Sequence, residues 1–468
     1  MASKAPKTTK ATYRCSECGW TTPKWVGRCG ECQTWGSVSE VGAVAIRTTA
    51  ASHVERPAVP IAQVDARRAE ARSTGVGEFD RVLGGGLVAG AVVLVAGEPG
   101  IGKSTLLLDV AAQVAQAGGT VLYVSGEESA AQVRVRAERI GAIADRLYLA
   151  SETDLATLLG QVEAVQPDLL VVDSVQTISS GEIEGAAGNV SQVREVAASV
   201  IAAAKRRDMA TLLVGHVTKD GSIAGPRVLE HLVDVVVQFE GERHSRLRLV
   251  RAVKNRYGPT DEVGCFDLSD VGIVGLTDPS GLFLSSRDTE VAGTCVTVTL
   301  EGRRPLVAEV QALLDQTRAT NPRRTTSGVD HNRTAMVLAV LSKHARLAVH
   351  ECDAYLATVG GVRLTEPAAD LAVAIALASS LAGTPVASGT VAFGEVGLAG
   401  EVRACTGLQR RLIEAARLGF RRAIVPTGTV AQGQLPAGIQ VLEVNQVGRA
   451  IGLALDLGPR RGEGPDGD

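Results

Sequence analysis

The sequence predicts an α/β fold, with a parallel sheet packed between helices, preceded by a small cysteine-rich module. The first observation is an apolar run at residues 91–96 that leads into a glycine-rich turn at 97–104 and then into a helix-like segment. The second is an alternation of strand-like and helix-like segments up to residue 174, which is typical of parallel sheets. The third is the concentration of four of the eight cysteines in the first 32 residues.

Length and composition set limits on the function. A chain of 468 residues is long enough for about three domains. The 48 basic and 51 acidic side chains nearly balance, so contact with a nucleic acid would depend on local basic patches. No apolar run is long enough to cross a membrane, and none follows the lysines of the first ten residues. We therefore expect neither a membrane span nor a secretory signal, and a cytoplasmic location.

The N-terminal cysteines form two C-x2-C pairs, Cys15 with Cys18 and Cys29 with Cys32. This spacing can place four thiolates tetrahedrally around one Zn²⁺, and metal binding would stabilise a segment too short for a core of its own. Two disulfides are the alternative, which the reducing cytosol disfavours. We predict a zinc ribbon. The other four cysteines are scattered, and we expect them to be buried: Cys265, Cys295, Cys352 and Cys405.

The aromatic residues of the ribbon leave two interpretations open. Its tryptophans either stack on bases, with nearby cations on phosphates, or form the only core of the module. The residues concerned are Trp20, Trp25 and Trp35, with Lys24 and Arg28.

The turn at residues 97–104 has the glycine spacing of a Walker A loop, in the strand and helix context that this motif requires. Its backbone N–H groups would surround a phosphate, Lys103 would reach the outer phosphates, and Ser104 would offer its hydroxyl to Mg²⁺. The alternative is a chance glycine turn. We predict that ATP and Mg²⁺ bind here, in contact with Gly97, Glu98, Pro99, Gly100, Ile101, Gly102, Lys103, Ser104 and Thr105.

Two acidic positions suit a hydrolytic site. The apolar run 169–172 ends in Asp173, which is the expected Walker B carboxylate for Mg²⁺; a helix cap is the alternative. Hydrolysis also needs a carboxylate to activate water, and Glu127 follows the strand-like segment 120–125 at the same sheet edge. Its neighbour Glu128 is either solvated or at the start of the next helix.

These features occur in the order found in a known family. The four-cysteine ribbon, the Walker A loop, the segment 124–129 (VSGEES) and the segment 254–258 (KNRYG) resemble those of the bacterial RadA family, also called Sms. The resemblance covers residues 13–455. It implies a RecA-like P-loop ATPase core and a C-terminal α+β domain similar to that of Lon protease, in a DNA repair protein. Tyr257 stands where the family usually has Phe, a change that keeps the ring.

The resemblance also implies a contact between subunits. In RecA-like rings a Lys/Arg pair of this kind reaches the ATP of the neighbouring subunit, which makes Lys254 and Arg256 the candidates here. Without the resemblance we would favour a basic turn between strands. By the same similarity, the segment 213–226 combines a γ-phosphate sensor with a DNA-facing loop. Its candidates are His216, for which a structural role is the alternative, Thr218 and Lys219.

The C-terminal part resembles the proteolytic domain of Lon but lacks its catalytic residues. The resemblance places the serine of Lon at Ala368 and its lysine at Gln409. Because alanine has no nucleophilic atom and an amide is not a base, we expect no peptidase activity. The polar, basic run 316–328 predicts a boundary after Leu314. The fold would remain a platform for ring assembly and DNA contact. Six basic residues are candidates for its surface: Arg303, Arg304, Lys343, Arg346, Arg410 and Arg411.

The predicted function is a DNA-dependent ATPase of recombinational DNA repair. By the resemblance it assembles as a homo-oligomeric ring, expected to be hexameric, and drives branch migration on single-stranded and branched DNA, with a RecA-type recombinase as partner. The alternatives are a nucleotide-switched DNA-binding module without motor activity and an ATP-dependent protease. The predicted domains are a zinc ribbon (1–36), a linker (37–72), the ATPase (73–290), an inactive Lon-protease-like domain with a hinge near 315–333 (291–458) and a disordered tail (459–468).

Overall fold

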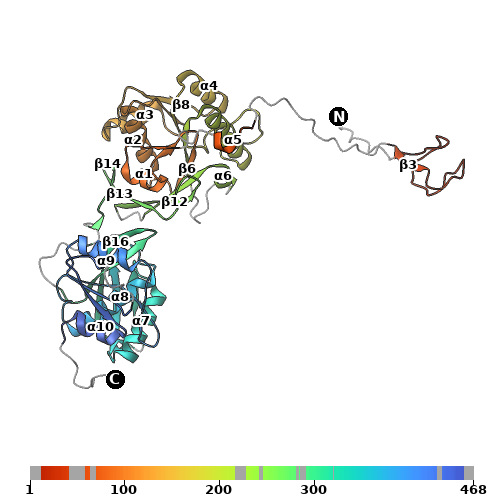
Figure 1. Cartoon of the computed structure of the whole chain (residues 1–468). Helices are drawn as coiled ribbons and strands as arrows, with labels where there is room; N and C mark the ends of the chain where they lie inside the picture. Colours follow the sequence, from red (N-terminus) through yellow and green to blue (C-terminus); the bar gives the residue numbers. More distant parts are fainter. Residues whose placement is uncertain are drawn as a thin grey trace. The chain divides into compact units, whose positions relative to one another are not determined.

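The computed structural model in Figure 1 describes residues 12–41, 58–63, 70–216, 228–241, 246–280, 284, 291–319, 321–428 and 435–457. These residues belong to two compact units, one within residues 1–65 and one within residues 66–468. The predicted tail and the loop candidates Thr218 and Lys219 lie outside the described residues.

The first unit is a three-stranded antiparallel sheet in the order β2-β1-β3. Its elements are β1 (Thr12–Cys15), β2 (Thr21–Thr22) and β3 (Val38–Val41), followed by a 3-10 turn, η1 (Ile61–Gln63). The core consists of the buried Cys15, Cys29 and Val38, with Trp20 packed against them. Because β3 pairs with β1 and contributes Val38 to this core, the ribbon extends beyond its predicted end at residue 36.

A nine-stranded sheet forms the N-terminal part of the second unit, in the order β14-β13-β12-β11-β6-β10-β9-β7-β8. The six strands from β11 to β8 in this order are parallel, and antiparallel pairings join β11 to β12, β12 to β13 and β13 to β14. The strands are β6 (Val92–Gly97), β7 (Val121–Ser125), β8 (Leu147–Ser151), β9 (Leu169–Asp173), β10 (Ala210–His216), β11 (Val235–Glu240), β12 (Leu247–Asn255), β13 (Val263–Ser269) and β14 (Gly272–Gly275), with a separate pair β4 (Ala71–Arg72) and β5 (Leu87–Val88).

Helices cover both faces of this sheet (Figure 1). One face packs against α1 (Gly77–Leu83), α2 (Lys103–Gln116) and α3 (Ala130–Arg139), and the other against α4 (Leu155–Val165), α5 (Val190–Arg207) and α6 (Val228–Leu232). Burial on both faces explains why the central strands are continuous apolar runs. The carboxyl ends of the parallel strands share one edge, where His216 is level with Gly97, and Ser125 with Asp173.

A seven-stranded sheet forms the C-terminal part of the second unit, in the order β17-β18-β16-β15-β19-β22-β23. Its strands are β15 (Thr294–Glu301), β16 (Arg304–Gln316), β17 (Arg324–Ser327), β18 (Cys352–Thr358), β19 (Thr390–Ala392), β22 (Arg422–Pro426) and β23 (Gln440–Val444), with a hairpin of β20 (Glu395–Val396) and β21 (Val402–Arg403) beside them. Helices α7 (His331–His344), α8 (Asp370–Ala382) and α10 (Val447–Ala454) pack in one core and α9 (Leu408–Arg417) in another, with 3-10 turns η4 (Val349–Glu351), η5 (Val359–Gly361) and η6 (Pro367–Ala369).

The polar run 316–328 begins at the last residue of β16 and contains the whole of β17. Both β16 and β17 pair with β18, so the predicted boundary after Leu314 falls inside the sheet. β17 lies at the sheet edge and its residues alternate between exposed and half-buried, which accounts for a polar composition within a strand.

Two of the six basic residues predicted for the surface are buried. Arg304 forms an ion pair with Glu78 on α1, and the two side chains are only 7% and 3% exposed. Arg411 forms a bidentate ion pair with Glu366, at 2.6 Å for both contacts. A guanidinium is buried only where carboxylates and carbonyl groups accept its hydrogen bonds, and this long-range pairing is not visible in the sequence. The other four are exposed as expected: Arg303, Lys343, Arg346 and Arg410.

Cysteine burial agrees with the prediction for Cys265, Cys295 and Cys352, whereas Cys405 is half-buried. Within the parts of the chain that the structure describes, no helix combines the length and the apolar character needed to cross a bilayer.

Candidate functional site

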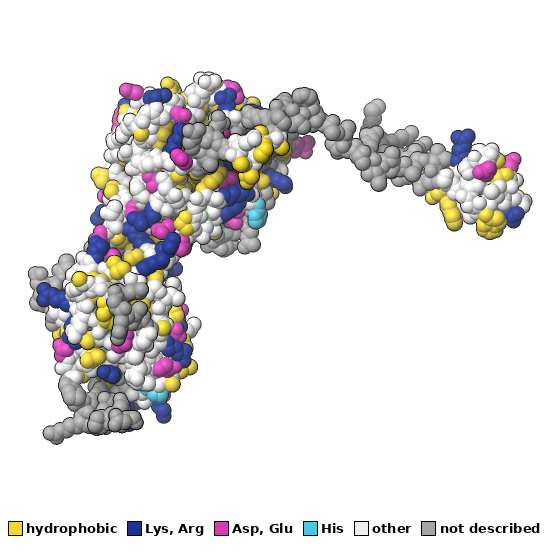
Figure 2. Space-filling view, viewed as in Figure 1, with side chains coloured by type: hydrophobic (Ala, Val, Ile, Leu, Met, Phe, Trp, Pro, Cys, Tyr) yellow, Lys and Arg dark blue, Asp and Glu magenta, His cyan; other side chains and the backbone are white. Residues whose placement is uncertain are grey.

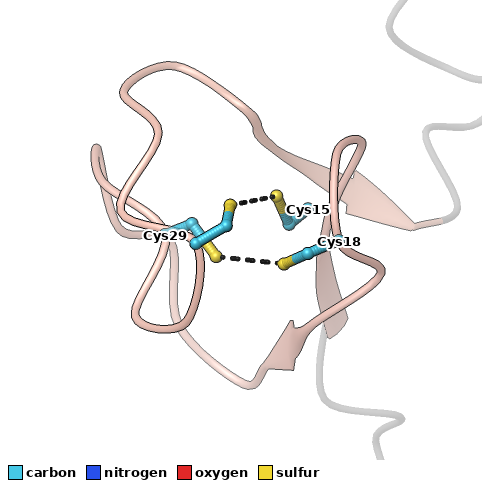
Figure 3. A group of neighbouring side chains, drawn as sticks. Cys15, Cys18 and Cys29 are labelled. Carbon is cyan, nitrogen blue, oxygen red and sulfur yellow. Dashed lines mark hydrogen bonds between the residues drawn. The ribbon is translucent and has the colours of Figure 1, made fainter.

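Four thiol groups converge in the ribbon (Figure 3). Sγ of Cys15 lies 3.7 Å from Sγ of Cys32, and Sγ of Cys18 lies 3.5 Å from Sγ of Cys29. A tetrahedral Zn²⁺ with Zn–S bonds of about 2.3 Å would hold its sulfurs about 3.8 Å apart, whereas a disulfide bond is about 2.05 Å long. The four cysteines are free, so they fit a zinc site and do not form the two disulfides considered above.

The three tryptophans of the ribbon have different surroundings. Trp20 packs against the buried cysteines, whereas Trp25 and Trp35 are 65% and 74% exposed. The guanidinium of Arg28 lies 5.8 Å from the ring centroid of Trp35, within the range of a cation–π contact. Apolar side chains are visible on the surface of the ribbon in Figure 2. Of the three tryptophans, only Trp20 therefore belongs to the core of the ribbon.

The Walker A loop connects β6 to α2, and Gly102, at a φ of 111°, precedes the helix. Lys103 is the first residue of α2 and is buried; its Nζ donates to the carbonyl groups of Gly97, at 2.8 Å, and Glu98, at 2.9 Å. Burial lowers the pKa of Lys103 to about 8, although the nearby carboxylates of Asp173 and Glu127 act in the opposite direction. The loop thus has an ammonium group and a helix N-terminus on one side, an arrangement that favours an anion.

Asp173 is the last residue of β9 and is buried. Its Oδ2 accepts a hydrogen bond of 2.6 Å from the hydroxyl of Tyr123 on β7. Burial raises the pKa of Tyr123 well above its usual range, and the charge of Asp173 adds to this effect. The phenol therefore remains a donor to the carboxylate. Sequence reasoning missed Tyr123, although one tyrosine in an aliphatic buried strand is a signal, because a buried hydroxyl needs a partner.

Glu127 and Glu128 follow β7 but have different partners. Oε1 of Glu127 lies 2.9 Å from Nε2 of His216 and accepts a 2.9 Å hydrogen bond from Ser174 Oγ. Burial raises the pKa of Glu127, but these hydrogen bonds and the charges of His216 and Lys103 outweigh it and hold the pKa below its usual range. Glu128 instead forms an ion pair with Arg136 on α3. Of the two glutamates, Glu127 is thus the one whose carboxylate lies near Lys103, whereas that of Glu128 is paired with α3.

Lys254 and Arg256 lie at the end of β12 and just beyond it. Nζ of Lys254 donates to the carbonyl groups of Glu230 and Val233, both at 2.8 Å. Burial and the charge of Arg256 lower the pKa of Lys254. The Lys254 ammonium is therefore held by two carbonyl groups near the C-terminal end of α6.

Asp234 links this pair to a further cation that sequence reasoning missed. Its buried carboxylate lies 3.1 Å from Nη1 of Arg256 and 2.6 Å from Nζ of Lys205, and it accepts a 3.0 Å hydrogen bond from the N–H of Val92. Burial raises the pKa of Asp234, but the Lys205 and Val92 hydrogen bonds and the two cations lower it below its usual range. An acid at the start of the apolar strand β11 is the signal that could have identified it.

The backbone places this cluster far from the Walker A loop of the same chain. The N–H of Arg256 bonds to the carbonyl of Asp234, and the N–H of Asp234 to that of Val92, the first residue of β6. Gly97 is five residues further along β6, about 17 Å at the rise of a strand. Lys254 and Arg256 therefore lie at the opposite edge of the sheet from Lys103, Glu127 and Asp173.

The segments that resemble the Lon catalytic positions are tied together by an ion pair. Ala368 is buried in η6, and Gln409 is exposed in the first turn of α9. The fully buried guanidinium of Arg411 on α9 bonds to Glu366, which lies just before η6. Neither Ala368 nor Gln409 supplies a nucleophile or a base.

Family models match three segments of the chain. Residues 13–40 match a rubredoxin metal binding domain, residues 55–222 an AAA domain, and residues 358–429 the subunit ChlI of Mg-chelatase. These segments correspond to the ribbon, most of the nine-stranded sheet and part of the seven-stranded sheet.

Curated relatives are similar over nearly the whole length. The chain is 55% identical to the DNA repair protein RadA of Mycobacterium tuberculosis strain H37Rv over 458 residues, which is 97% of this chain and 95% of the relative. It is 54% identical to the DNA repair protein RadA of Mycolicibacterium smegmatis, over 94% of this chain and 96% of the relative. It is 48% identical to that of Streptococcus pyogenes serotype M1, over 94% and 98%. A KaiC-like protein of Pyrococcus horikoshii matches 44% of this chain and 99% of that chain, at 21% identity and a TM-score of 0.38, too low to support an argument.

Proposed function

Since the chain belongs to the RadA family of DNA repair proteins, we propose that it is a DNA-dependent ATPase motor that processes branched intermediates in recombinational repair. The family and the fold class predicted from the sequence are confirmed: a P-loop ATPase core with an N-terminal four-cysteine zinc ribbon and a C-terminal Lon-like domain. The proposal goes beyond this family membership in assigning movement along DNA and branch migration to the chain.

The proposed nucleotide site lies at the carboxyl edge of the parallel strands. The backbone N–H groups of residues 97–105, except Pro99, which has none, hold the phosphates, and Lys103 exchanges its carbonyl partners for phosphate oxygens. Ser104 and Asp173 would hold Mg²⁺, which would neutralise charge on the phosphates. The donor set fits this ion, because Mg²⁺ prefers hydroxyl and carboxylate oxygens. Tyr123 fixes the orientation of the Asp173 carboxylate by its hydrogen bond.

Glu127 is the proposed general base. Its carboxylate is ionised at neutral pH because its pKa is held low, so it can orient water and accept its proton. His216 and Ser174 fix the same carboxylate oxygen. A change in the position of the Glu127 carboxylate would displace His216, and with it the start of the segment that follows β10.

The observation that carries the proposal is the separation of two halves of a site on one chain. Lys103, Glu127 and Asp173 lie at one sheet edge, and Lys254 and Arg256 at the other. Arg256 is more than half exposed, so its guanidinium is accessible to a neighbour. We propose that Lys254 and Arg256 contact the nucleotide of a neighbouring subunit, which requires a homo-oligomer, a hexameric ring by the family resemblance.

Further parts of the proposal rest on the family. Single-stranded and branched DNA are the proposed substrates, a RecA-type recombinase is the proposed partner, and a cytoplasmic location is expected. Basic and acidic side chains are interspersed on the face seen in Figure 2, so DNA would bind through local groups of basic side chains. We propose residues 73–290 as the ATPase domain and 291–458 as the Lon-like domain, in line with the strands that form each sheet.

The experiment that tests the motor is steady-state ATP hydrolysis with and without single-stranded DNA. Lys103→Ala should abolish ATP binding. Lys254→Ala should retain ATP binding and lose DNA-stimulated hydrolysis, by about a thousandfold if the pair acts like an arginine finger. Arg139→Ala, at an exposed arginine in the last turn of α3, is the control and should behave as the parent chain.

The outcomes distinguish the alternatives. Hydrolysis that stays negligible with DNA present would favour the nucleotide-switched module. Hydrolysis indifferent to both DNA and Lys254 would leave a P-loop ATPase without the proposed composite site. Casein cleavage that survives repurification and is lost in Lys103→Ala would favour the ATP-dependent protease.

A further inference from the structure

A buried arginine contacts the Walker A loop from β12. Arg248 is 6% exposed. Its Nε donates to the carbonyl group of Ile101 at 3.2 Å, and its Nη1 donates to the carbonyl group of Leu247 at 2.8 Å. Since a guanidinium keeps its proton in a protein, this contact places a positive charge beside the loop that carries Lys103.

The contact fixes one peptide group of the loop. In a planar trans peptide the C=O and the N–H point in opposite directions. Arg248 holds the carbonyl of Ile101, so the N–H of Gly102 in the same peptide points away from Arg248. Gly102 also has a φ of 111°, in a region that favours glycine, so this turn depends on a specific backbone conformation. Arg248 therefore sets the direction of one N–H in a loop whose N–H groups are its phosphate ligands.

The strand that carries Arg248 runs between the two edges of the sheet. At its start, Leu249 pairs with Glu240 near the carboxyl end of β11, which is parallel to β6; at its end, Asn255 pairs with Val235 at the start of β11. From Arg248 to Arg256 the chain advances eight residues, about 26 Å at the rise of a strand. One end of β12 thus contacts the Walker A loop, and the other carries the half-buried Lys254 and leads to the exposed Arg256.

We propose that Arg248 is a positioning residue of the nucleotide site, and that β12 connects the Walker A loop to Lys254 and Arg256 at the opposite edge. The inference rests on the proposed function for the roles of the loop and the pair. When phosphate changes the position of the Ile101 carbonyl, Arg248 moves with it. The displacement passes along β12, which pairs with β11 from Leu249 to Asn255 with a bulge at Val253. A subunit would thereby transmit its own nucleotide state to the residues that face its neighbour.

Nucleotide affinity tests the positioning role. We would measure the Kd of Mg-ADP for the full chain by calorimetry. Arg248→Met should weaken binding by about tenfold to a hundredfold, because a hydrogen bond from a charged donor is lost. Arg248→Lys, which retains a donor and the charge, should recover part of the affinity. Arg246→Met is the matched control, since Arg246 is exposed and forms an ion pair with Asp267, and it should bind as the parent chain.

A structural role would give a different pattern. If Arg248 only stabilises the β11–β12 hairpin, Arg248→Met lowers the thermal midpoint while Kd stays unchanged in the folded fraction, and the proposal is overturned. Failure of the parent chain to bind Mg-ADP would contradict the proposed function itself. A parent chain that binds without DNA-stimulated hydrolysis would contradict the motor and leave Arg248 as a positioning residue.

Hydrogen–deuterium exchange tests the connection. In the parent chain, Mg-ADP should slow exchange in peptides that cover residues 252–258, and Arg248→Met, at saturating Mg-ADP, should remove this effect. In Arg246→Met the effect should persist. The connection through β12 would be disproved if Mg-ADP did not change the exchange rate of these peptides in the parent chain. It would also be disproved if Mg-ADP slowed exchange equally in Arg248→Met.

Discussion

Nε2 of His216, the last residue of β10, lies 2.9 Å from Oε1 of Glu127, just beyond β7. The two residues are 89 positions apart in the sequence and meet because their strands end at the same edge of the sheet. The contact is one reason why the pKa of Glu127 lies below its usual range, in opposition to burial, which raises it.

Replacement of His216 should therefore change the pH dependence of hydrolysis. A base must be ionised to accept a proton, so activity is lost as the pH falls through the pKa of Glu127. His216→Ala removes a hydrogen bond and a nearby positive charge while burial remains, and the pKa should rise. We expect the acid limb of the kcat profile to move up by roughly one pH unit. His231→Ala, at an exposed histidine of α6, should leave the limb in place. An unchanged acid limb in His216→Ala would show that another group sets it.

The zinc site should be the only support of the ribbon fold. Its core consists of two cysteines and one valine with a few partly buried neighbours, and metal binding supplies the folding free energy of such small modules. Cys29→Ser should lose zinc, measured by elemental analysis, and should shift tryptophan emission to the red because Trp20 leaves this core. All three tryptophans of the chain are in the ribbon, so the signal reports on that unit alone. Cys405→Ser should keep its zinc, and unchanged emission in a zinc-free Cys29→Ser would contradict the prediction.

The buried ion pair of Arg304 on β16 and Glu78 on α1 should stabilise the packing of the Lon-like part against the ATPase part. Arg304→Met removes the buried cation of Glu78 and leaves the carboxylate with the partly exposed Arg81, at 3.5 Å. Breaking a buried ion pair typically costs about 3–5 kcal/mol, so a loss near the lower end of this range is expected in the free energy of urea unfolding of this part. Replacement of both residues by methionine should recover much of the loss. Arg303→Met, next to it but exposed and paired with exposed Asp261, should cost less than about 1 kcal/mol. Equal losses for the Arg303 and Arg304 variants would refute the assignment.

The parts predicted well from the sequence are those in which local patterns decide the structure. The Walker A loop and the end of β9 at Asp173 follow from glycine spacing and an apolar run.

The parts that were missed depend on contacts between distant segments. Arg304 and Arg411 carry the same charge as exposed arginines, and only the carboxylates of Glu78 and Glu366, far away in the sequence, allow them to be buried. Arg248 alternates with leucines like an ordinary exposed strand residue, and its contact with Ile101 spans 147 positions. Local composition cannot identify such partners, because they are set by the order of strands in the sheet.

The low pKa of Lys103 should make nucleotide binding take up a proton in mildly alkaline solution. Without nucleotide, burial lowers the pKa of Lys103 to about 8, and phosphate oxygens, which are anionic, should raise it on binding. Near pH 9 the free side chain is mostly neutral and the bound one is charged, so close to one proton should be taken up; near pH 7 both are charged and uptake should vanish. The affinity for Mg-ADP should accordingly fall as the pH rises above about 8. Calorimetry in buffers of different ionisation enthalpy measures the uptake directly. Lys254→Ala should keep most of it, because Lys254 lies at the opposite sheet edge, whereas uptake that disappears in Lys254→Ala would assign the titrating ammonium to the neighbouring subunit instead.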